Sequence, residues 1–352
     1  MCKHALHPLL ARLPKTEHHL HLEGTLEPEL LFALAGRNGI ALPVDDAAFA
    51  DEGTLLRRYE DFASLDDFLH YYAVGISTLV KVEDYEALAW AYFLRAHADG
   101  VRHAEVFFDP QAHTSRGIGL KTVLNGIGKA RRRAETELGL STLVIPCILK
   151  PFPVPDALAL LNSEEFKAAV KEGEVTGIGI CGSEAAYPPV LFKEVYATAK
   201  EMGLRLTAHA GEEGPAAYVA GALDDLGVER VDHGIAITGD DALVRRAAEE
   251  KIMLTVCPLS NVRLRCVKQV KDLPFRRFLD EGVRFSINSD DPAYFGGYIL
   301  DNYCAVQESF DLTVKEWEKV IRDNIDSSWC SDKRKAELLT MLDDVLNEWN
   351  SS

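Results

Sequence analysis

The sequence predicts a (β/α)8 TIM barrel, in which eight parallel strands lie inside a ring of helices. Its length of 352 residues, with 47% hydrophobic and 26% charged residues, suits one large folded α/β domain. Eight short apolar or β-branched runs recur along the chain with helix-length segments between them, which is the alternation of such a barrel. No low-complexity linker or internal repeat divides the chain, so we expect a single domain over residues 1–352.

The predicted strands follow one another at intervals that fit helical crossovers, except after the first. They cover residues 16–22, 101–108, 143–149, 176–180, 205–209, 230–233, 252–257 and 283–288. The gap between positions 22 and 101 is much longer than the others, so we expect extra helices there. Within it, residues 59–72 have an aromatic helical face that would pack in the core or, as the family resemblance described below implies, form a side wall of the site.

The crossover helices are predicted by apolar residues at helical spacing. They cover residues 83–96, 120–138, 191–202, 215–226, 240–251 and 275–281, and two trailing helices cover 314–323 and 332–348. Gly203 and Gly282 stand where helices should end before a strand. An open doubly wound sheet is the alternative architecture. It would require a glycine-rich phosphate-binding turn after the first strand, and none follows residue 22.

Charge and cysteine usage exclude several classes of protein. The formal net charge of −17 would repel nucleic acid and anionic membranes, so we expect a small-molecule partner. No apolar run is long enough to span a membrane, and residues 1–15 lack the apolar core of a signal peptide. The seven cysteines are odd in number and form no CxxC pair, which argues against a disulfide framework. We expect a cytoplasmic protein, also nuclear if the source is eukaryotic, and leave its oligomeric state open.

Histidines and carboxylates gather at the predicted strand ends. His19 and His21 lie two residues apart on the first strand and therefore share a face. Such a pair alone fits core packing equally well. In a barrel, however, His209 from the fifth strand and Asp290 after the eighth would join them at the carboxyl end. Three neutral histidines and one carboxylate suit Zn²⁺ with an open position for water, so we expect one zinc ion per chain.

Three further residues complete the chemistry of a metal-assisted hydrolase. A bound Zn²⁺ lowers the pKa of its water to about 7, which makes hydroxide available at neutral pH. His233, at the end of the sixth strand, would orient or deprotonate that water. Glu212, three residues after His209, would move a proton to or from the substrate. Asp291 would accept a hydrogen bond from a substrate N–H.

Five motifs together resemble the adenosine/adenine deaminase family, and most of all its fungal and bacterial adenine deaminase branch. They are EHHLHLEG (17–24), HAGEEG (209–214), RVDHG (230–234), CPLSN (257–261) and NSDDPAYFGGY (288–298). The resemblance covers residues 13–345. It implies a barrel of the metal-dependent hydrolase type that binds zinc, hydrolyses the 6-amino group of a purine and releases ammonia, as in purine salvage.

The resemblance also implies a role for each site residue. His19, His21, His209 and Asp290 would hold the zinc, which agrees with the ligand set derived from the strand ends. Glu212 would protonate the purine N1, and His233 would assist the attacking hydroxide. Asp291 would hydrogen-bond the N7 side of the ring, and the backbone N–H of Gly182 would approach N3.

Two features favour adenine over adenosine as substrate. Glu23 stands where nucleoside-accepting relatives carry an aspartate that meets the ribose, and residues 107–110 resemble the free-base branch. Two strand-end segments depart from that branch, at residues 150–153 and 179–184. An N6-substituted adenine, adenosine or another aminated heterocycle therefore remains an alternative substrate, and a non-catalytic purine-binding descendant an alternative function.

Overall fold

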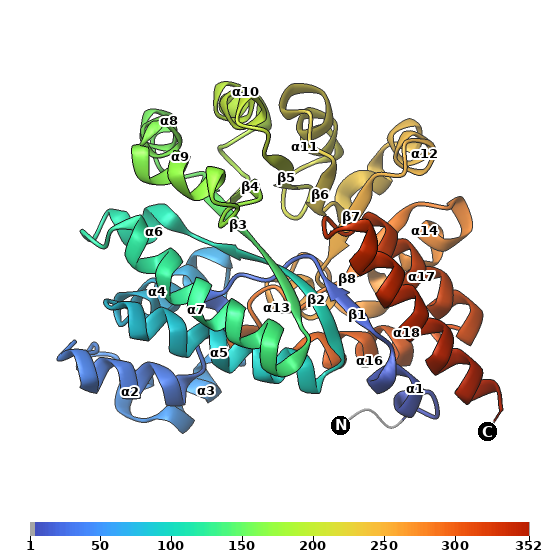
Figure 1. The fold of residues 1–352 in the computed structure, drawn as a ribbon, viewed down its shortest axis with the longest axis horizontal. Helices are drawn as coiled ribbons and strands as arrows, with labels where there is room; N and C mark the ends of the chain where they lie inside the picture. The colour runs from blue at the N-terminus through green and yellow to red at the C-terminus, as the bar shows by residue number, and fades with distance from the viewer. Residues whose placement is uncertain (1–3, 352) are drawn as a thin grey trace.

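Eight parallel strands form the centre of the molecule. The computed structural model describes residues 4–351, and within them the strands pair in sequence order from β1 to β8 (Figure 1). Their bounds are β1 Lys15–Glu17, β2 Val101–Phe108, β3 Ser141–Leu149, β4 Gly177–Cys181, β5 Arg205–Ala210, β6 Arg230–His233, β7 Met253–Val256 and β8 Arg284–Ile287. The predicted (β/α)8 barrel is therefore confirmed.

Segments just beyond two strand ends close the barrel between its first and last strands. The N–H of His21 donates to the carbonyl of Asp290, and the N–H of Asp290 donates to the carbonyl of His19. An isolated parallel bridge joins Leu20 to Asp290 at the same place. Residues predicted to bind metal thus also form the seam of the barrel, which fixes their backbones relative to one another.

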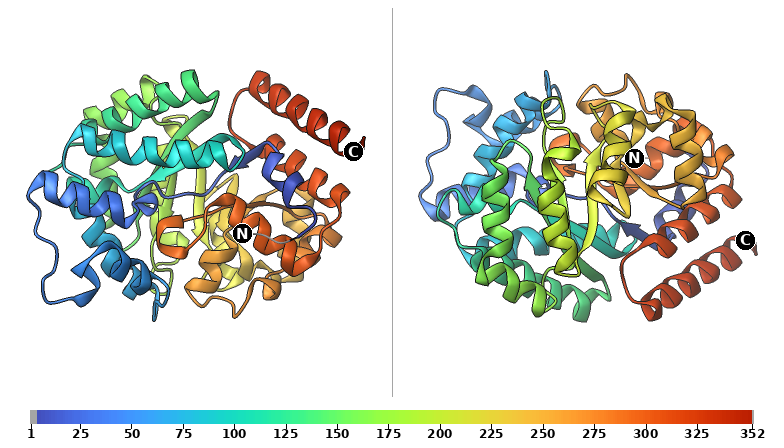
Figure 2. Two further views of the ribbon diagram at one scale, coloured as in Figure 1. Left: turned by 90° about the horizontal axis from the view of Figure 1, so that it is seen from below. Right: turned by 90° about the horizontal axis from the view of Figure 1, so that it is seen from above.

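Helices surround the barrel, and several of them belong to the long first crossover (Figures 1 and 2). The insertion predicted between the first two strands contains α2 Pro28–Asn38, α3 Glu52–Tyr59, α4 Leu65–Ser77 and α5 Val82–Ala98. The later helices include α7 Leu120–Leu138, α8 Val154–Asn162, α9 Glu164–Lys171, α10 Lys193–Glu201, α11 Ala216–Gly221, α12 Asp241–Glu249, α13 Pro258–Arg263, α14 Phe275–Glu281, α16 Ile299–Phe310, α17 Val314–Ser327 and α18 Asp332–Asn350. Short helices α1 His7–Arg12, α6 Pro110–Thr114 and α15 Pro292–Phe295 complete the helical set.

The first strand is shorter than predicted. Regular pairing ends at Glu17, because the N–H of His18 donates to the side chain of Asn288 instead of a neighbouring strand. Single bridges resume the pairing at Leu20 and His21. The predicted helix over 215–226 also differs, since α11 continues into one π-helical turn over Ala222–Leu226.

Close packing of α5 against α7 depends on one glycine. A Cβ added to Gly126 would lie 2.5 Å from the Cβ of Tyr85 and from the carbonyl of Val82, whereas one added to Gly128 would meet only the flexible end of Arg132. We expect Gly126→Ala to lower the free energy of unfolding by about 1–3 kcal/mol through overpacking. Gly128→Ala should raise it by about 0.5–1 kcal/mol, because alanine favours the helix. Urea denaturation of both variants tests this, and stabilisation by both would contradict it.

Two further findings concern membrane-spanning helices and cysteines. Over residues 4–351 the chain has no helix whose length and apolarity would let it cross a membrane. Within the same range, five cysteines carry free thiols: Cys147, Cys181, Cys257, Cys266 and Cys330.

Candidate active site

Polar side chains from widely separated strands meet at the carboxyl end of the barrel. His19 and His21 follow β1, His209 lies in β5, His233 ends β6 and Asp290 follows β8. All five are buried. The backbones of His233 and Asp290 have φ of 60° and 63°, in the left-handed region that non-glycine residues seldom adopt. Such local strain is typical of residues whose side chains are held in one direction for function.

The four predicted ligands lie close to one another in pairs. Nε2 of His19 lies 3.1 Å and Nε2 of His21 lies 3.7 Å from the same oxygen, Oδ1 of Asp290. Nε2 of His21 lies 3.1 Å from Nε2 of His209. Ligand atoms at about 2.0–2.1 Å from one tetrahedral ion are roughly 3.3 Å apart, so the spacing suits a shared divalent metal. The predicted ligands His19, His209 and Asp290 belong to one group of possible ligand atoms within 4.8 Å of one another, and the fourth member of that group is His233. His21 lies beside this group and also belongs to a second group, with Asp109 and Cys181.

The opposite ring nitrogens of these histidines face partners that orient the rings. Nδ1 of His19 lies 2.9 Å from Oγ1 of Thr255, and Nδ1 of His209 lies 3.2 Å from a carboxylate oxygen of Asp232. Nε2 of His19 is buried and has no hydrogen-bond partner among the described residues. Burial, together with the neighbouring imidazole of His19, lowers the pKa of His209 well below its usual value. A neutral imidazole is the form that binds metal, and His209 favours it. Burial lowers the pKa of His21, but the neighbouring carboxylates of Asp109 and Asp291 outweigh it and raise that pKa well above its usual value.

His233 and Glu212 lie beside this cluster. Nε2 of His233 is 3.4 Å from a carboxylate oxygen of Glu212 and 4.0 Å from the second oxygen of Asp290. His233 is close enough to His19, His209 and Asp290 to count as an alternative ligand. Burial, and then the charges of Asp290 and Glu184, raise the pKa of Glu212 well above its usual value. The protonated, proton-donating form of Glu212 is therefore favoured.

The loop that carries Glu212 is fixed by Glu184, a residue that the sequence interpretation did not select. The carboxylate of Glu184 is buried and accepts hydrogen bonds from the backbone N–H groups of Gly211, Glu212 and Gly214, at 2.9, 3.1 and 3.0 Å. Both of its oxygens are used. Glu184 thus fixes the backbone position from which the Glu212 side chain extends.

Glu184→Gln is expected to lower kcat by about 10- to 100-fold, because a shift of the acid by about 1 Å costs that much. A glutamine amide offers only one acceptor oxygen, so at least one buried N–H of the Gly211–Gly214 loop would lose its partner. The metal ligands do not contact Glu184 and should keep their metal. Steady-state kinetics with metal analysis tests this. A variant with full kcat, or one that loses activity only through loss of metal, would contradict it.

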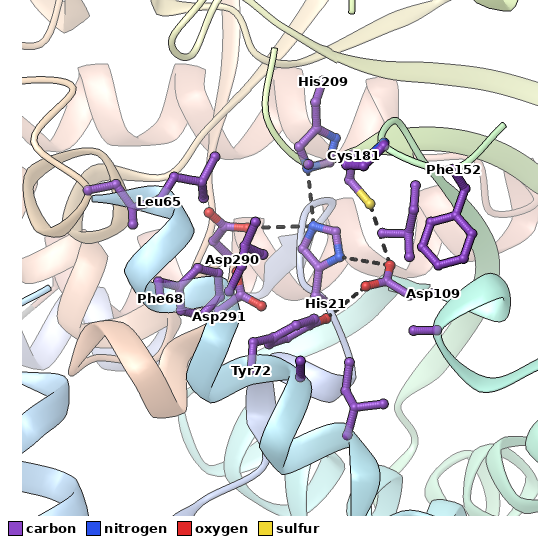
Figure 3. A pocket seen from close by; sticks show the side chains of 18 of the residues that line it. His21, Leu65, Phe68, Tyr72, Asp109, Phe152, Cys181, His209, Asp290 and Asp291 are labelled. Atoms are coloured by element: carbon purple, nitrogen blue, oxygen red, sulfur yellow. Dashed lines mark hydrogen bonds and ion pairs between the residues drawn. The ribbon is translucent and has the colours of Figure 1, made fainter. Parts of the chain in front are cut away.

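The cluster opens into a cavity with a volume of about 400 Å³ (Figure 3). Asp291 and Gly182 line it, and Oδ1 of Asp291 is buried without a partner among the described residues. Its other walls are largely apolar and include Leu65, Phe68, Leu69, Tyr72, Ala73 and Ile76 of α4, together with Pro151, Phe152 and Leu264. The aromatic segment predicted over 59–72 thus contributes both to the core and to the cavity wall.

Comparison with known proteins shows which family the chain belongs to. A sequence model described as "Adenosine deaminase" matches residues 14–345. The chain belongs to the adenosine deaminase family. Within this family it is 54% identical to an adenine deaminase of Aspergillus fumigatus and 51% identical to one of Schizosaccharomyces pombe. These alignments cover 98% of this chain in both cases, and 98% and 94% of the relatives.

Solved structures extend the family comparison. The crystal structure of an adenine deaminase from Arthrobacter aurescens matches with a TM-score of 0.89 and 44% identity, and covers 97% of this chain and 100% of that chain. An amidohydrolase from Burkholderia ambifaria, solved with bound Zn, matches with a TM-score of 0.86 and 29% identity over 100% of this chain and 96% of that chain. Both are TIM-barrel relatives of this family member.

Glu23, which we expect to contact the substrate, and Lys150 both make structural contacts at strand ends of this deaminase-family chain. Glu23 does not line the cavity formed by the described residues. Its Oε1 instead lies 2.6 Å from Nε2 of His113 and accepts the backbone N–H of Asp109 at 3.0 Å. Asp109 itself lines the cavity. Lys150, one of the departures from the family pattern, donates to the carbonyl of His209 at 2.9 Å and so joins β3 to β5.

Proposed function

We propose that this chain hydrolyses adenine to hypoxanthine and ammonia with one bound zinc ion, as a step of purine salvage. The observation that carries the proposal is that one cavity is lined by His21, His209 and Asp290 of the metal cluster, by Glu212 and His233 beside it, and by Asp291 and Gly182. The names of the relatives at 54% and 51% identity support adenine as the substrate.

Zinc is the metal that the donor set favours. Three neutral imidazoles and one carboxylate, with Thr255 and Asp232 orienting two of the rings, are typical of a catalytic zinc site. A cation bound between these side chains would fit the buried Nε2 of His19, which lies 3.1 Å from Oδ1 of Asp290, and the 3.1 Å approach of the His21 and His209 nitrogens. When bound, such an ion would supply Lewis-acid activation of a water molecule.

The side chains around the metal would divide the proton transfers between them. Glu212 donates a proton to N1, so that the ring accepts an electron pair when water adds to C6. His233 takes up one proton of that water and passes it to the 6-amino group, which leaves as ammonia. The remaining hydroxyl proton returns to Glu212. Asp291 and the N–H of Gly182 hold the ring at its N7 and N3 sides while this happens.

A second candidate substrate class is an adenine with an apolar substituent on its 6-amino group. The observation in its favour is the size and lining of the cavity: about 400 Å³, walled by apolar side chains such as Phe152 and Leu264. That volume falls in the range of sites for drug-sized ligands and exceeds what a bare bicyclic base requires. A small apolar group would occupy the remaining space without leaving polar atoms unpaired.

The substrate panel that decides between these functions is adenine, N6-methyladenine, adenosine and AMP, each tested with zinc-loaded protein. Adenine absorbance should change to that of hypoxanthine, with one ammonia released per base. Turnover of adenosine or N6-methyladenine alone would reassign the substrate, and turnover of no aminopurine would leave a non-catalytic binding protein.

Two further proposals concern the domain organisation and the location of the protein. We propose that residues 1–352 act as one domain, because the site draws residues from strands at both ends of the chain. We also propose a cytoplasmic or nuclear location, which the free thiols of Cys147, Cys181, Cys257, Cys266 and Cys330 support.

A further inference from the structure

We infer that Asp109 selects free purine bases by accepting the N9–H of the substrate, and that Glu23 acts only by holding Asp109 in place. The inference rests on the proposed function, since it takes the purine to lie in the cavity with N3 toward Gly182 and N7 toward Asp291. The family resemblance names a partner for N3 and a partner for N7 of the purine. It names none for N9, which is the atom that this inference concerns.

The carboxylate of Asp109 is held in one orientation. It follows β2 directly, lines the cavity and is 2% exposed. Oδ2 accepts the hydroxyl proton of Tyr72 at 3.0 Å, while Oδ1 lies 3.6 Å from Nδ1 of His21 and 3.5 Å from Sγ of Cys181 (Figure 3). Tyr72 and Cys181 thus donate one hydrogen bond to each oxygen, whereas Nδ1 of His21 lies beyond hydrogen-bond distance. A carboxylate offers about four lone-pair sites, so the side chain keeps acceptor capacity for a substrate N–H.

The position of Asp109 matches that of N9. In a purine, N9 lies between N3 and N7 along the edge of the ring system. Asp109 likewise lies between the two groups that would bind those atoms. On one side its Oδ1 lies 3.5 Å from Sγ of Cys181, the residue before Gly182, and on the other the same oxygen lies 3.6 Å from Nδ1 of His21. Figure 3 shows Asp291 and Asp109 on opposite sides of His21, with Tyr72 below them.

A buried carboxylate at N9 discriminates strongly between a base and a nucleoside. A free base presents N9–H as a donor, whereas a nucleoside carries a carbon substituent there. The substituent would remove the hydrogen bond, leave the carboxylate of Asp109 facing an apolar group and crowd Tyr72. Sites built to bind an N–H reject analogues that lack it by large factors, because the buried polar group is left unpaired.

Glu23 supports this arrangement from behind. Its Oε1 accepts the backbone N–H of Asp109, and His113 holds that oxygen from the other side at 2.6 Å. Glu23 therefore fixes the point where the Asp109 side chain starts without reaching the cavity. Tyr85 in turn lies 3.0 Å from Nδ1 of His113, which completes a buried chain of contacts behind the wall.

The test compares kcat/KM for adenine and 9-methyladenine in the wild type and in Asp109→Ala, with zinc content measured in both. We expect the wild type to prefer adenine by about 10³-fold or more and the variant to lose at least about 30-fold of that preference. Discrimination against 7-deazaadenine, which changes the opposite edge, should be the same in both proteins. A zinc-loaded variant whose adenine to 9-methyladenine ratio equals that of the wild type would overturn the inference.

Two further measurements separate this inference from its alternatives. Calorimetric binding of hypoxanthine and 9-methylhypoxanthine to Asp109→Ala and Asp109→Asn reports the same preference without turnover, so it tests Asp109 even if adenine is not the substrate. Absence of adenine turnover by the wild type would defeat the proposed function alone. For Glu23, the alanine variant should reduce the preference and Glu23→Gln should restore it, since an amide oxygen can still accept both hydrogen bonds. A Glu23→Ala variant with an unchanged ratio would refute the positioning role.

Discussion

Glu212→Gln is expected to lower kcat/KM for adenine by about 10³-fold while the protein retains its metal, because general acid catalysis contributes about 10²–10⁴-fold. The amide has nearly the shape of the acid but cannot transfer a proton to N1. Glu212 lies beside His233 and outside the four atoms that surround the metal position, so its replacement leaves the ligands in place. Steady-state kinetics and metal analysis on the same preparation measure both effects.

Glu213→Gln is the matched control for this experiment. It makes the same chemical change one residue further along the loop, at an exposed position that does not line the cavity of the described residues. We expect kcat/KM within about twofold of the wild type, as for most surface substitutions. Equal losses in the two variants would mean that negative charge on the loop, and not a proton held by Glu212, supports the reaction.

His21→Ala should abolish both metal binding and activity, with activity falling on the order of 10³-fold or more, equivalent to about 4 kcal/mol. Nε2 of His21 lies within 3.7 Å of both His209 and Asp290, so its removal opens one side of the metal site. Zinc content by mass spectrometry after dialysis measures the first effect, and adenine hydrolysis measures the second.

His233→Ala provides the contrast, because His233 could also belong to the metal cluster. Its Nε2 lies nearer to Glu212 than to either oxygen of Asp290. We therefore expect this variant to keep its zinc and to lose about 10²–10⁴-fold in kcat, as expected for a residue that transfers protons. The assignment of ligands would be wrong if His233→Ala lost the metal and His21→Ala kept it.

The sequence predicted the barrel well because parallel strands buried on both faces appear as short apolar runs, and the bounds of the later strands agree closely. It overestimated the first strand, since nothing in the spacing of residues 16–22 reveals that the N–H of His18 bonds to Asn288, which is 270 residues away. Such a side-chain contact leaves no periodic signal.

The same limit explains the site residues that were missed. Glu184 and Asp109 act through hydrogen bonds to backbone and side-chain groups far along the chain. The sequence nevertheless contains one signal for both residues. Both residues come just after the end of a strand, so the strand-end rule that selected His209 and Asp290 also selects them when it is applied to β2 and β4.

The most direct test of the account is a crystal structure of the zinc-loaded protein with anomalous diffraction measured at the zinc absorption edge. We predict one anomalous peak per chain, at about 2 Å from Nε2 of His19, His21 and His209 and from an oxygen of Asp290. A peak bound by His233 in place of His21, or no peak among these four side chains, would contradict it.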